Sequence, residues 1–142
     1  MDMMSPTRPH AVLRLLILVV AAAMLGCAGD ATGPLDRIPD GNWGGERIGL
    51  LVDQSGVSFL FDCAGGRVDQ PISLDSRGNF DVLGTYSGAG NAQNADQSPH
   101  PARYAGHATR TRVDVTRTIL DQSGPGVPFS ALRGAPPMIV AC

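Results

Sequence analysis

Lysine is absent from this 142-residue chain, so all 11 basic residues are arginine. Catalysis through a lysine Schiff base and phosphate binding by a P-loop lysine are therefore excluded. Glutamate occurs once, as Glu46, and a carboxylate pair for glycoside hydrolysis could be assembled only from aspartates. The net charge of -2 provides no basic footprint for nucleic acid.

Other catalytic groups are scarce as well. After the first 27 residues the only histidines are His100 and His107, whose spacing matches no known zinc motif. No Gly-x-Ser-x-Gly motif is present to suggest a serine nucleophile. We therefore expect no catalytic residues, no metal and no cofactor, and we predict that the protein is not an enzyme.

Only one long apolar run is present, and it lies near the N-terminus. It spans residues 15–25 and follows Arg8, His10 and Arg14. Eleven residues form about 16 Å of helix, too short to cross a hydrocarbon core of about 30 Å. A basic start, a short apolar stretch and then small residues predict a secretory signal peptide over residues 1–26.

The end of this segment, Met24-Leu25-Gly26-Cys27-Ala28, resembles the lipobox of bacterial lipoprotein precursors. The resemblance implies that Cys27 is acylated, becomes the new N-terminus and anchors the protein to membrane lipid. It places the protein in the bacterial cell envelope, with the folded domain in the periplasm or at the cell surface. Ala28 in place of Asp favours the outer membrane. The alternative is an ordinary signal peptide that leaves Cys27 as a free thiol.

Three cysteines in an exported chain leave one unpaired. If Cys27 carries lipid, Cys63 and Cys142 remain as a disulfide pair. Such a bond would close a loop of about 80 residues, worth roughly 4–5 kcal/mol in the chain-entropy model. Free buried thiols are the alternative.

The segment after the lipidated cysteine has neither a helical nor an alternating apolar pattern. Together with Cys27, residues 28–40 are expected to form a flexible tether, because the segment contains Pro34, Pro39 and many small residues. Residues 41–142 then form a single antiparallel β domain.

A recurring Asp-x-x-Gly pattern marks the turns of this domain. Aspartate at the first turn position caps its own backbone, and glycine at the fourth accepts a positive φ at little cost. This pattern predicts short hairpins with a glycine bulge. The three pairs are Asp53 and Gly56, Asp75 and Gly78, and Asp121 and Gly124.

The segments between these turns alternate between apolar and polar residues, as half-buried strands do. No amphipathic stretch of helical period occurs after residue 30, and most connections are short. We therefore predict an all-β fold, a small antiparallel up-and-down barrel of about eight strands, with a two-sheet β-sandwich as the alternative. The expected strands are 46–52, 57–63, 67–74, 79–86, 102–107, 112–120, 127–133 and a short 138–142.

Trp43, the only tryptophan, lies within Gly41-Asn42-Trp43 just before the first expected strand. Gly-x-Trp at this place resembles the opening of calycins, the lipocalins and avidins, and residues 84–86 fit the end of an avidin-like strand. The resemblance implies that Trp43 closes one end of the barrel and packs near a late arginine, here Arg133. It also implies a ligand cavity, although avidin's pocket tryptophans have no counterpart.

Two further features bear on function. The loop 87–101 is far longer than the other connections and is either a mobile surface loop or a contact loop. Arg110 and Arg112 should share one strand face, solvated or in contact with anionic lipid or glycan, whereas Arg117 points to the opposite face. Two partner classes remain open, a small ligand in the barrel or an envelope protein such as a lysozyme or protease to be inhibited. The oligomeric state is not determined by the sequence.

Overall fold

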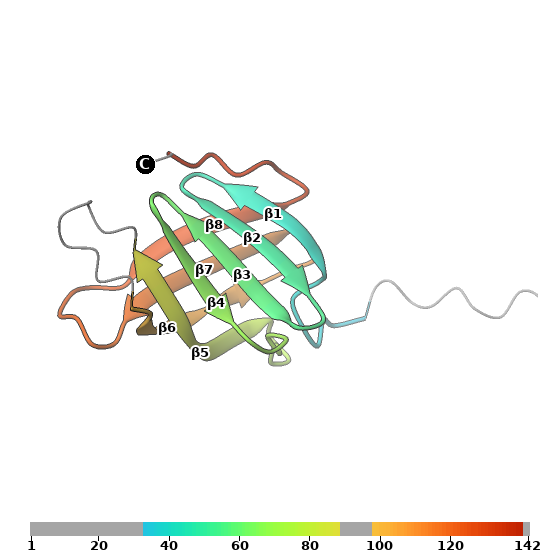
Figure 1. The fold of residues 1–142 in the computed structure, drawn as a ribbon. Helices are drawn as coiled ribbons and strands as arrows, with labels where there is room; N and C mark the ends of the chain where they lie inside the picture. Colours follow the sequence, from blue (N-terminus) through green and yellow to red (C-terminus); the bar gives the residue numbers. More distant parts are fainter. Residues whose placement is uncertain (1–32, 89–97, 141–142) are drawn as a thin grey trace, which may run out of the picture. The chain divides into compact units, whose positions relative to one another are not determined.

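A computed structural model describes residues 33–88 and 98–140. The described residues beyond Gly33 belong to one unit that begins at Pro34. They form eight antiparallel strands in chain order (Figure 1). The strands are β1 (Gly41–Gly45), β2 (Ile48–Asp53), β3 (Gly56–Phe61), β4 (Ala64–Val68), β5 (Asn79–Gly88), β6 (His100–Ala108), β7 (Arg112–Ile119) and β8 (Val127–Arg133).

The sheet closes on itself, because β1 pairs with β8 as well as with β2. Trp43 lies opposite Arg133 and Gly44 lies opposite Leu132 at this seam. Every other pairing joins neighbours in the chain. The structure is therefore the predicted eight-stranded up-and-down barrel, and the two-sheet alternative is wrong.

The first strand was not predicted, because β1 is rich in glycine, which local propensity assigns to turns. Close approach of neighbouring backbone explains this composition. A Cβ on Gly44 would lie 2.3 Å from the carbonyl oxygen of Ala135, and one on Gly45 would lie 2.0 Å from that of Ser130. The strand is thus specified by long-range packing that no local pattern contains.

The short strand predicted over 138–142 is a second error. Within the described part of this segment, Met138 makes one isolated parallel bridge with Glu46. Residues 134–140, which we call the C-terminal strap, lie along the outside of the barrel instead. Arg47 donates its backbone N–H to the Met138 carbonyl at 2.9 Å, and Met138 donates to the Gly45 carbonyl at 3.0 Å.

The predicted strand 67–74 is also too long. β4 ends at Val68, and the chain then leaves the sheet. Pro71 cannot donate to a strand ladder. Ile72 is nevertheless only 1% exposed, because it covers one end of the barrel.

The expected tether includes residues that pack against the barrel. Ile38 is only 1% exposed, and its backbone N–H donates to the Ile72 carbonyl at 3.1 Å. Leu74 donates to the Asp36 carbonyl at 2.8 Å. Residues 36–40 therefore belong to the folded unit, because the side chain of Ile38 is buried in the core.

The barrel interior is filled by side chains from the inward positions of the strands. The rings of Phe59 and Tyr104 stack with centroids 4.2 Å apart, and those of Phe61 and Phe129 lie 4.9 Å apart. Both Tyr104 and Val113 are fully buried. Eight strands are just enough to enclose such a row of side chains.

The alternation of up and down strands gives the barrel two distinct ends. Ile38, Trp43 and Ile72 cover one of them, the closed end. The connections 46–47, 62–63 and 120–126 lie at the opposite end, which we call the open end (Figure 1). The residues considered below as candidate sites lie at one or the other of these two ends.

Candidate functional site

Trp43 and Arg133, which the sequence pairs through the calycin resemblance, meet at the closed end. Trp43 is 1% exposed, and its Nε1 donates to the Pro39 carbonyl at 3.2 Å. The Arg133 guanidinium lies 5.9 Å from the Trp43 ring centroid and donates to the Asp40 carbonyl at 2.8 Å. Because the indole N–H is satisfied and the ring is covered, this end of the barrel is plugged.

The first predicted turn forms between β2 and β3, where Asp53 lies opposite Gly56. Asp53 Oδ1 accepts hydrogen bonds from Ser55 Oγ at 2.5 Å, Ser55 N at 2.7 Å and Gly56 N at 3.1 Å. The bond from the Ser55 hydroxyl, followed by those from the turn amides, lowers the pKa of Asp53 below its usual value. The carboxylate therefore holds a turn, as the pattern predicts.

The second predicted turn follows the same chemistry. Asp75 Oδ1 accepts from the backbone N–H groups of Asn79 and Arg77, each at 2.8 Å. These bonds, the one from Asn79 first, lower the pKa of Asp75. Gly78 has φ +82°, the left-handed conformation that glycine adopts without strain.

The third pair, Asp121 and Gly124, lies in the connection between β7 and β8 but is built differently. Asp121 Oδ2 contacts His100 Nδ1 at 2.8 Å, which joins this connection to the first residue of the neighbouring strand β6. Gly124 does not adopt the left-handed conformation. The connection runs for seven residues, 120–126, so a tight aspartate-capped turn is not required there.

The cysteines are only partly described. Cys27 and Cys142 lie outside the described residues. Cys63 lies in the two-residue turn between β3 and β4, with φ +53°, and not at a strand end as predicted; it is disulfide-bonded. Pairing with Cys142 stays a prediction, and it is supported by the backbone N–H of Val140, which donates to Asp62 Oδ1 at 2.9 Å.

Arg117 is the residue whose importance sequence reasoning missed. Its alternation with Val113 and Val115, which are 0% and 3% exposed, directs its side chain into the barrel. The sequence placed it on the opposite face from Arg112 but did not identify that face as the interior. The expected arginine cluster is therefore divided, since Arg112 pairs outside with Asp114 at 2.9 Å.

Three aromatic rings surround the Arg117 guanidinium at the open end, and we call this group the Arg117 cage. The guanidinium carbon lies 4.3 Å from the ring centroid of Tyr86, 4.9 Å from that of Phe61 and 5.5 Å from that of Phe129. The rings come from β5, β3 and β8. Only closure of the barrel brings these strands around one side chain.

No carboxylate of the described residues pairs with the Arg117 guanidinium. Its Nε is buried and has no hydrogen-bond partner among the described residues. Desolvation raises the pKa of Tyr104, the cross-strand neighbour of Arg117, so this phenol stays neutral; it donates to the Thr85 carbonyl at 2.8 Å. Among the described residues, the open end therefore holds an arginine whose buried Nε–H has no acceptor.

A small cavity of about 160 Å³ adjoins the cage. Arg117 forms one side of it, and Ile119 and Val127 form an apolar side. The connection between β7 and β8 completes the wall with Gln122, Ser123, Gly124 and Pro125. The cavity thus combines a cation, an apolar wall and polar side chains.

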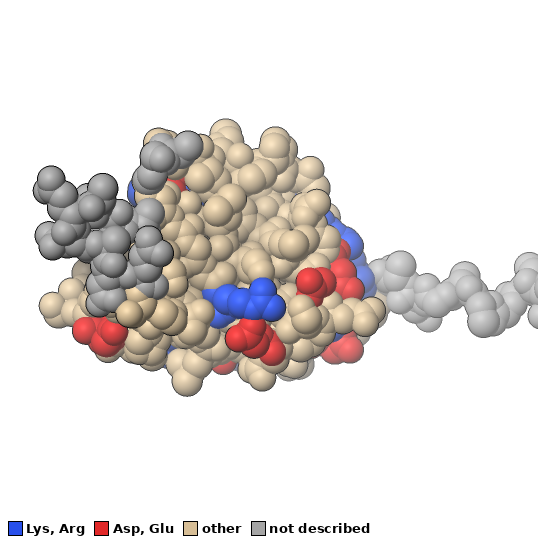
Figure 2. All heavy atoms as spheres, in the orientation of Figure 1, with Lys and Arg blue, Asp and Glu red and all other residues tan. Residues whose placement is uncertain are grey.

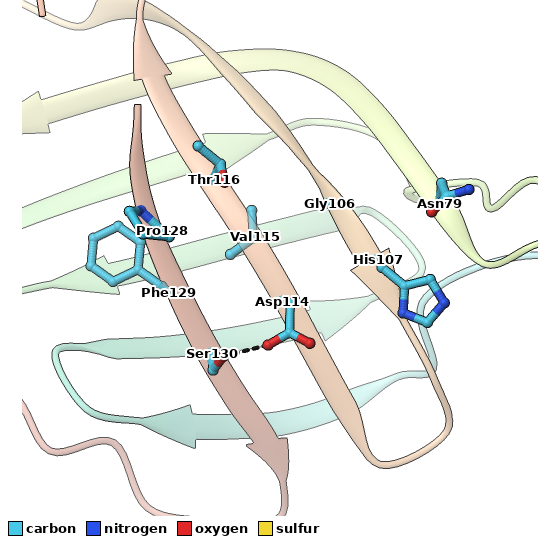
Figure 3. A pocket seen from close by; sticks show the side chains of 9 residues that line it. All are labelled: Asn79, Gly106, His107, Asp114, Val115, Thr116, Pro128, Phe129 and Ser130. Carbon is cyan, nitrogen blue, oxygen red and sulfur yellow. Dashed lines mark hydrogen bonds between the residues drawn. The ribbon is translucent and has the colours of Figure 1, made fainter. Parts of the chain in front are cut away.

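A larger hollow of about 620 Å³ lies over β6, β7 and β8 (Figure 3). Ser130 Oγ donates to Asp114, while the imidazole of His107 is directed away from Ser130 (Figure 3). His107 Nε2 instead contacts the Arg77 carbonyl at 3.0 Å. Ser130 thus bonds to a carboxylate, and no imidazole is placed to take the proton of its hydroxyl. Ser130, His107 and Asp114 therefore do not form a catalytic triad.

A third hollow, of about 550 Å³, lies on the outer face of β1–β3 beneath the C-terminal strap. Leu51 and Leu60 in its lining are each 51% exposed. The face formed by these strands carries few charged side chains (Figure 2). This groove is apolar and lies outside the barrel.

Within the described ranges 33–88 and 98–140, no three His, Cys, Asp or Glu side chains are grouped to hold a metal ion. No helix in the same ranges is long and apolar enough to span a membrane. The central part of the long loop, residues 89–97, lies outside the described residues. Comparison with protein-family models, with curated proteins and with solved structures finds no match.

Proposed function

We propose that this chain is an exported envelope lipoprotein whose barrel is a non-catalytic binding module. The signal-like segment 1–26 and the lipobox-like Met24–Ala28 support export and acylation at Cys27. The anchor holds the barrel at the bacterial envelope, with the outer membrane favoured, and the barrel faces the periplasm or the cell surface.

The Arg117 cage is the observation that carries the binding role. A partly buried charge is costly unless it is paired and hydrogen-bonded, yet the buried Nε of Arg117 has no acceptor among the described residues. An acceptor on an incoming group would satisfy this donor. The calycin-like reading agrees with this placement, because the closed end is plugged by Trp43 and a ligand would enter from the other end.

Contact with an envelope protein is the second candidate. The filled interior favours it, because stacked rings such as Phe59 and Tyr104 leave little room for a large ligand inside the barrel. Inhibition of an envelope hydrolase, a lysozyme or a protease, is one form of such contact. In this form the connections at the open end, and not a cavity, make the contact.

Fatty-acid labelling tests the anchor. We expect the full chain to incorporate labelled acyl groups and to partition into detergent, and the Cys27→Ser variant to lose both properties. Lipidation of Cys27→Ser to the extent of the parent chain would refute the anchor.

Crosslinking of the anchored protein in its own envelope, followed by pull-down, tests the binding role. We expect a captured partner or ligand that is reduced in Arg117→Gln and retained in Arg103→Gln. Arg103 is the matched control, because it lies on the outer face of β6 and already donates its Nε to Asp81 Oδ1 at 2.7 Å. Equal capture by all three proteins would remove the open end from the proposed function.

A further inference from the structure

We propose that the Arg117 cage and the adjoining cavity bind the carboxylate group of a small organic acid with a short apolar chain. This inference rests on the proposed binding function and names the class of ligand.

The guanidinium of Arg117 favours an anion as its ligand. The other arginine described at the open end already has an acidic partner, because Arg47 Nε donates to Asp62 Oδ2 at 2.5 Å. Arg117 has no ion pair among the described residues. A ligand with one negative charge would neutralise the Arg117 side chain, whereas the second charge of a phosphate dianion would have no cation.

The rings orient the guanidinium without consuming its hydrogen-bond donors. Cation–π contact uses the faces of Tyr86, Phe61 and Phe129, at 4.3–5.5 Å from the guanidinium carbon. The N–H groups of arginine lie in the guanidinium plane and match the two oxygens of a carboxylate. The cage thus fixes a donor fork in advance, which reduces the entropy cost of binding.

The cavity limits the size of the ligand. Its volume of about 160 Å³ is well below the 300 Å³ or so at which pockets for drug-sized ligands begin. It corresponds to about five waters at roughly 30 Å³ each, enough for an acid of butyrate size. Ile119 and Val127 form an apolar wall for the alkyl chain, and Gln122 and Ser123 provide further hydrogen-bonding groups.

The test is a titration of the purified full chain, labelled uniformly with ¹⁵N, at constant ionic strength. The probes are sodium butyrate, butylammonium chloride and inorganic phosphate, each followed by the arginine Nε–Hε signals and by the backbone amide signals of residues 119–127, which Arg117→Gln also provides. We expect butyrate to shift the Arg117 signal saturably, and Arg117→Gln to weaken binding at least about tenfold. Arg103→Gln should bind as the parent does.

The comparison of probes decides the chemistry. Equal binding of butylammonium would overturn the inference, since it would show an apolar pocket indifferent to charge. Stronger binding of phosphate, or no saturable shift with butyrate, would overturn it as well.

Two controls separate loss of binding from loss of folding and from failure of the proposed function. If far-UV circular dichroism shows that Arg117→Gln is unfolded, Ile119→Phe fills the cavity while leaving Arg117 in place, and it should weaken butyrate binding similarly; unchanged binding would contradict the inference. Failure with butyrate, together with Arg117-dependent capture in the envelope, would reject the carboxylate but leave the proposed function standing.

Discussion

The contact between Gly66 and Tyr104 inside the barrel yields the sharpest quantitative prediction. A Cβ on Gly66 would lie 2.1 Å from Tyr104 Oη, whereas ordinary contacts begin near 3.4 Å. Tyr104 has little freedom to move, because it is fully buried and stacks on Phe59 at 4.2 Å. We expect Gly66→Ala to cost about 3 kcal/mol, combining overpacking of about 1–3 kcal/mol with loss of the Tyr104 hydrogen bond, about 1 kcal/mol.

Tyr104→Phe removes the oxygen that the new methyl group would meet. Alone it should cost about 1 kcal/mol, because the Thr85 carbonyl loses its donor at 2.8 Å. In the double variant the nearest atoms would be the ring carbon of residue 104 and the Thr85 oxygen, both at 3.1 Å. A shift of a few tenths of an ångström relieves these contacts. The double variant should therefore be more stable than Gly66→Ala, by about 1–2 kcal/mol.

Urea unfolding of the full chain with its disulfide intact measures these free energies, using Trp43 fluorescence and far-UV circular dichroism together. Gly65→Ala is the matched control on the same strand, since its Cβ would meet only the Phe59 carbonyl at 3.7 Å. Additivity of the two substitutions within about 0.5 kcal/mol would refute the reasoning. So would a Gly65→Ala variant as unstable as Gly66→Ala.

Three further predictions concern the seam, the cage and the turns. Gly45→Ala should lower the stability by about 1–3 kcal/mol, read as a fall in melting temperature, because its Cβ would lie 2.0 Å from a carbonyl oxygen of β8. Arg117→Met should leave the melting temperature unchanged or raised while abolishing butyrate binding, because it removes a buried donor without an acceptor but still fills the cage; a fall of more than about 8 °C would contradict this. The pKa of Asp75 is lowered by the Asn79 amide, so its stabilisation is present above about pH 3.9, the unfolded value, and is lost as pH falls through the folded pKa. Acid unfolding should show a shallower pH dependence in Asp75→Asn, and an identical slope would show that this turn does not contribute.

Much of the barrel could be predicted from local patterns. Alternation along most of β5, the first half of β7 and most of β8 indicates which residues face the interior, and reading it requires no knowledge of distant strands. Asp53 and Asp75 identified two turns because their hydrogen bonds are to their own neighbours in the chain. Short connections then left an up-and-down order, and closure followed from the need to cover sheet edges.

The errors arose where long-range packing overrides a local signal. Gly44 and Gly45 look like turn residues, but their lack of a side chain admits the backbone of the C-terminal strap and of β8. Ile38 looks like part of a tether, yet it is 1% exposed at the closed end. A sequence does not show which distant segment will lie against a glycine or an isolated isoleucine.

The open end was hidden for the same reason. Arg117 is adjacent in sequence to none of the rings that surround it, because Phe61, Tyr86 and Phe129 come from three other strands. Its inward direction was the available signal, since Val115 two positions before it belongs to the core. An arginine in phase with buried valines on a barrel strand is a better indication of a binding site than a count of basic residues.

At position 117 the side chain that would give the highest stability differs from the one that is present. An apolar side chain there would stack on the same rings without leaving a donor unsatisfied, so stability alone favours Met or Leu over Arg. Cation–π contact with three rings recovers part of the cost, about 0.5–2 kcal/mol, but it provides no acceptor for the buried Nε. The carboxylate that we propose as ligand would supply this acceptor. A polar side chain that costs stability at a cavity is then the trade between stability and function that binding sites commonly show.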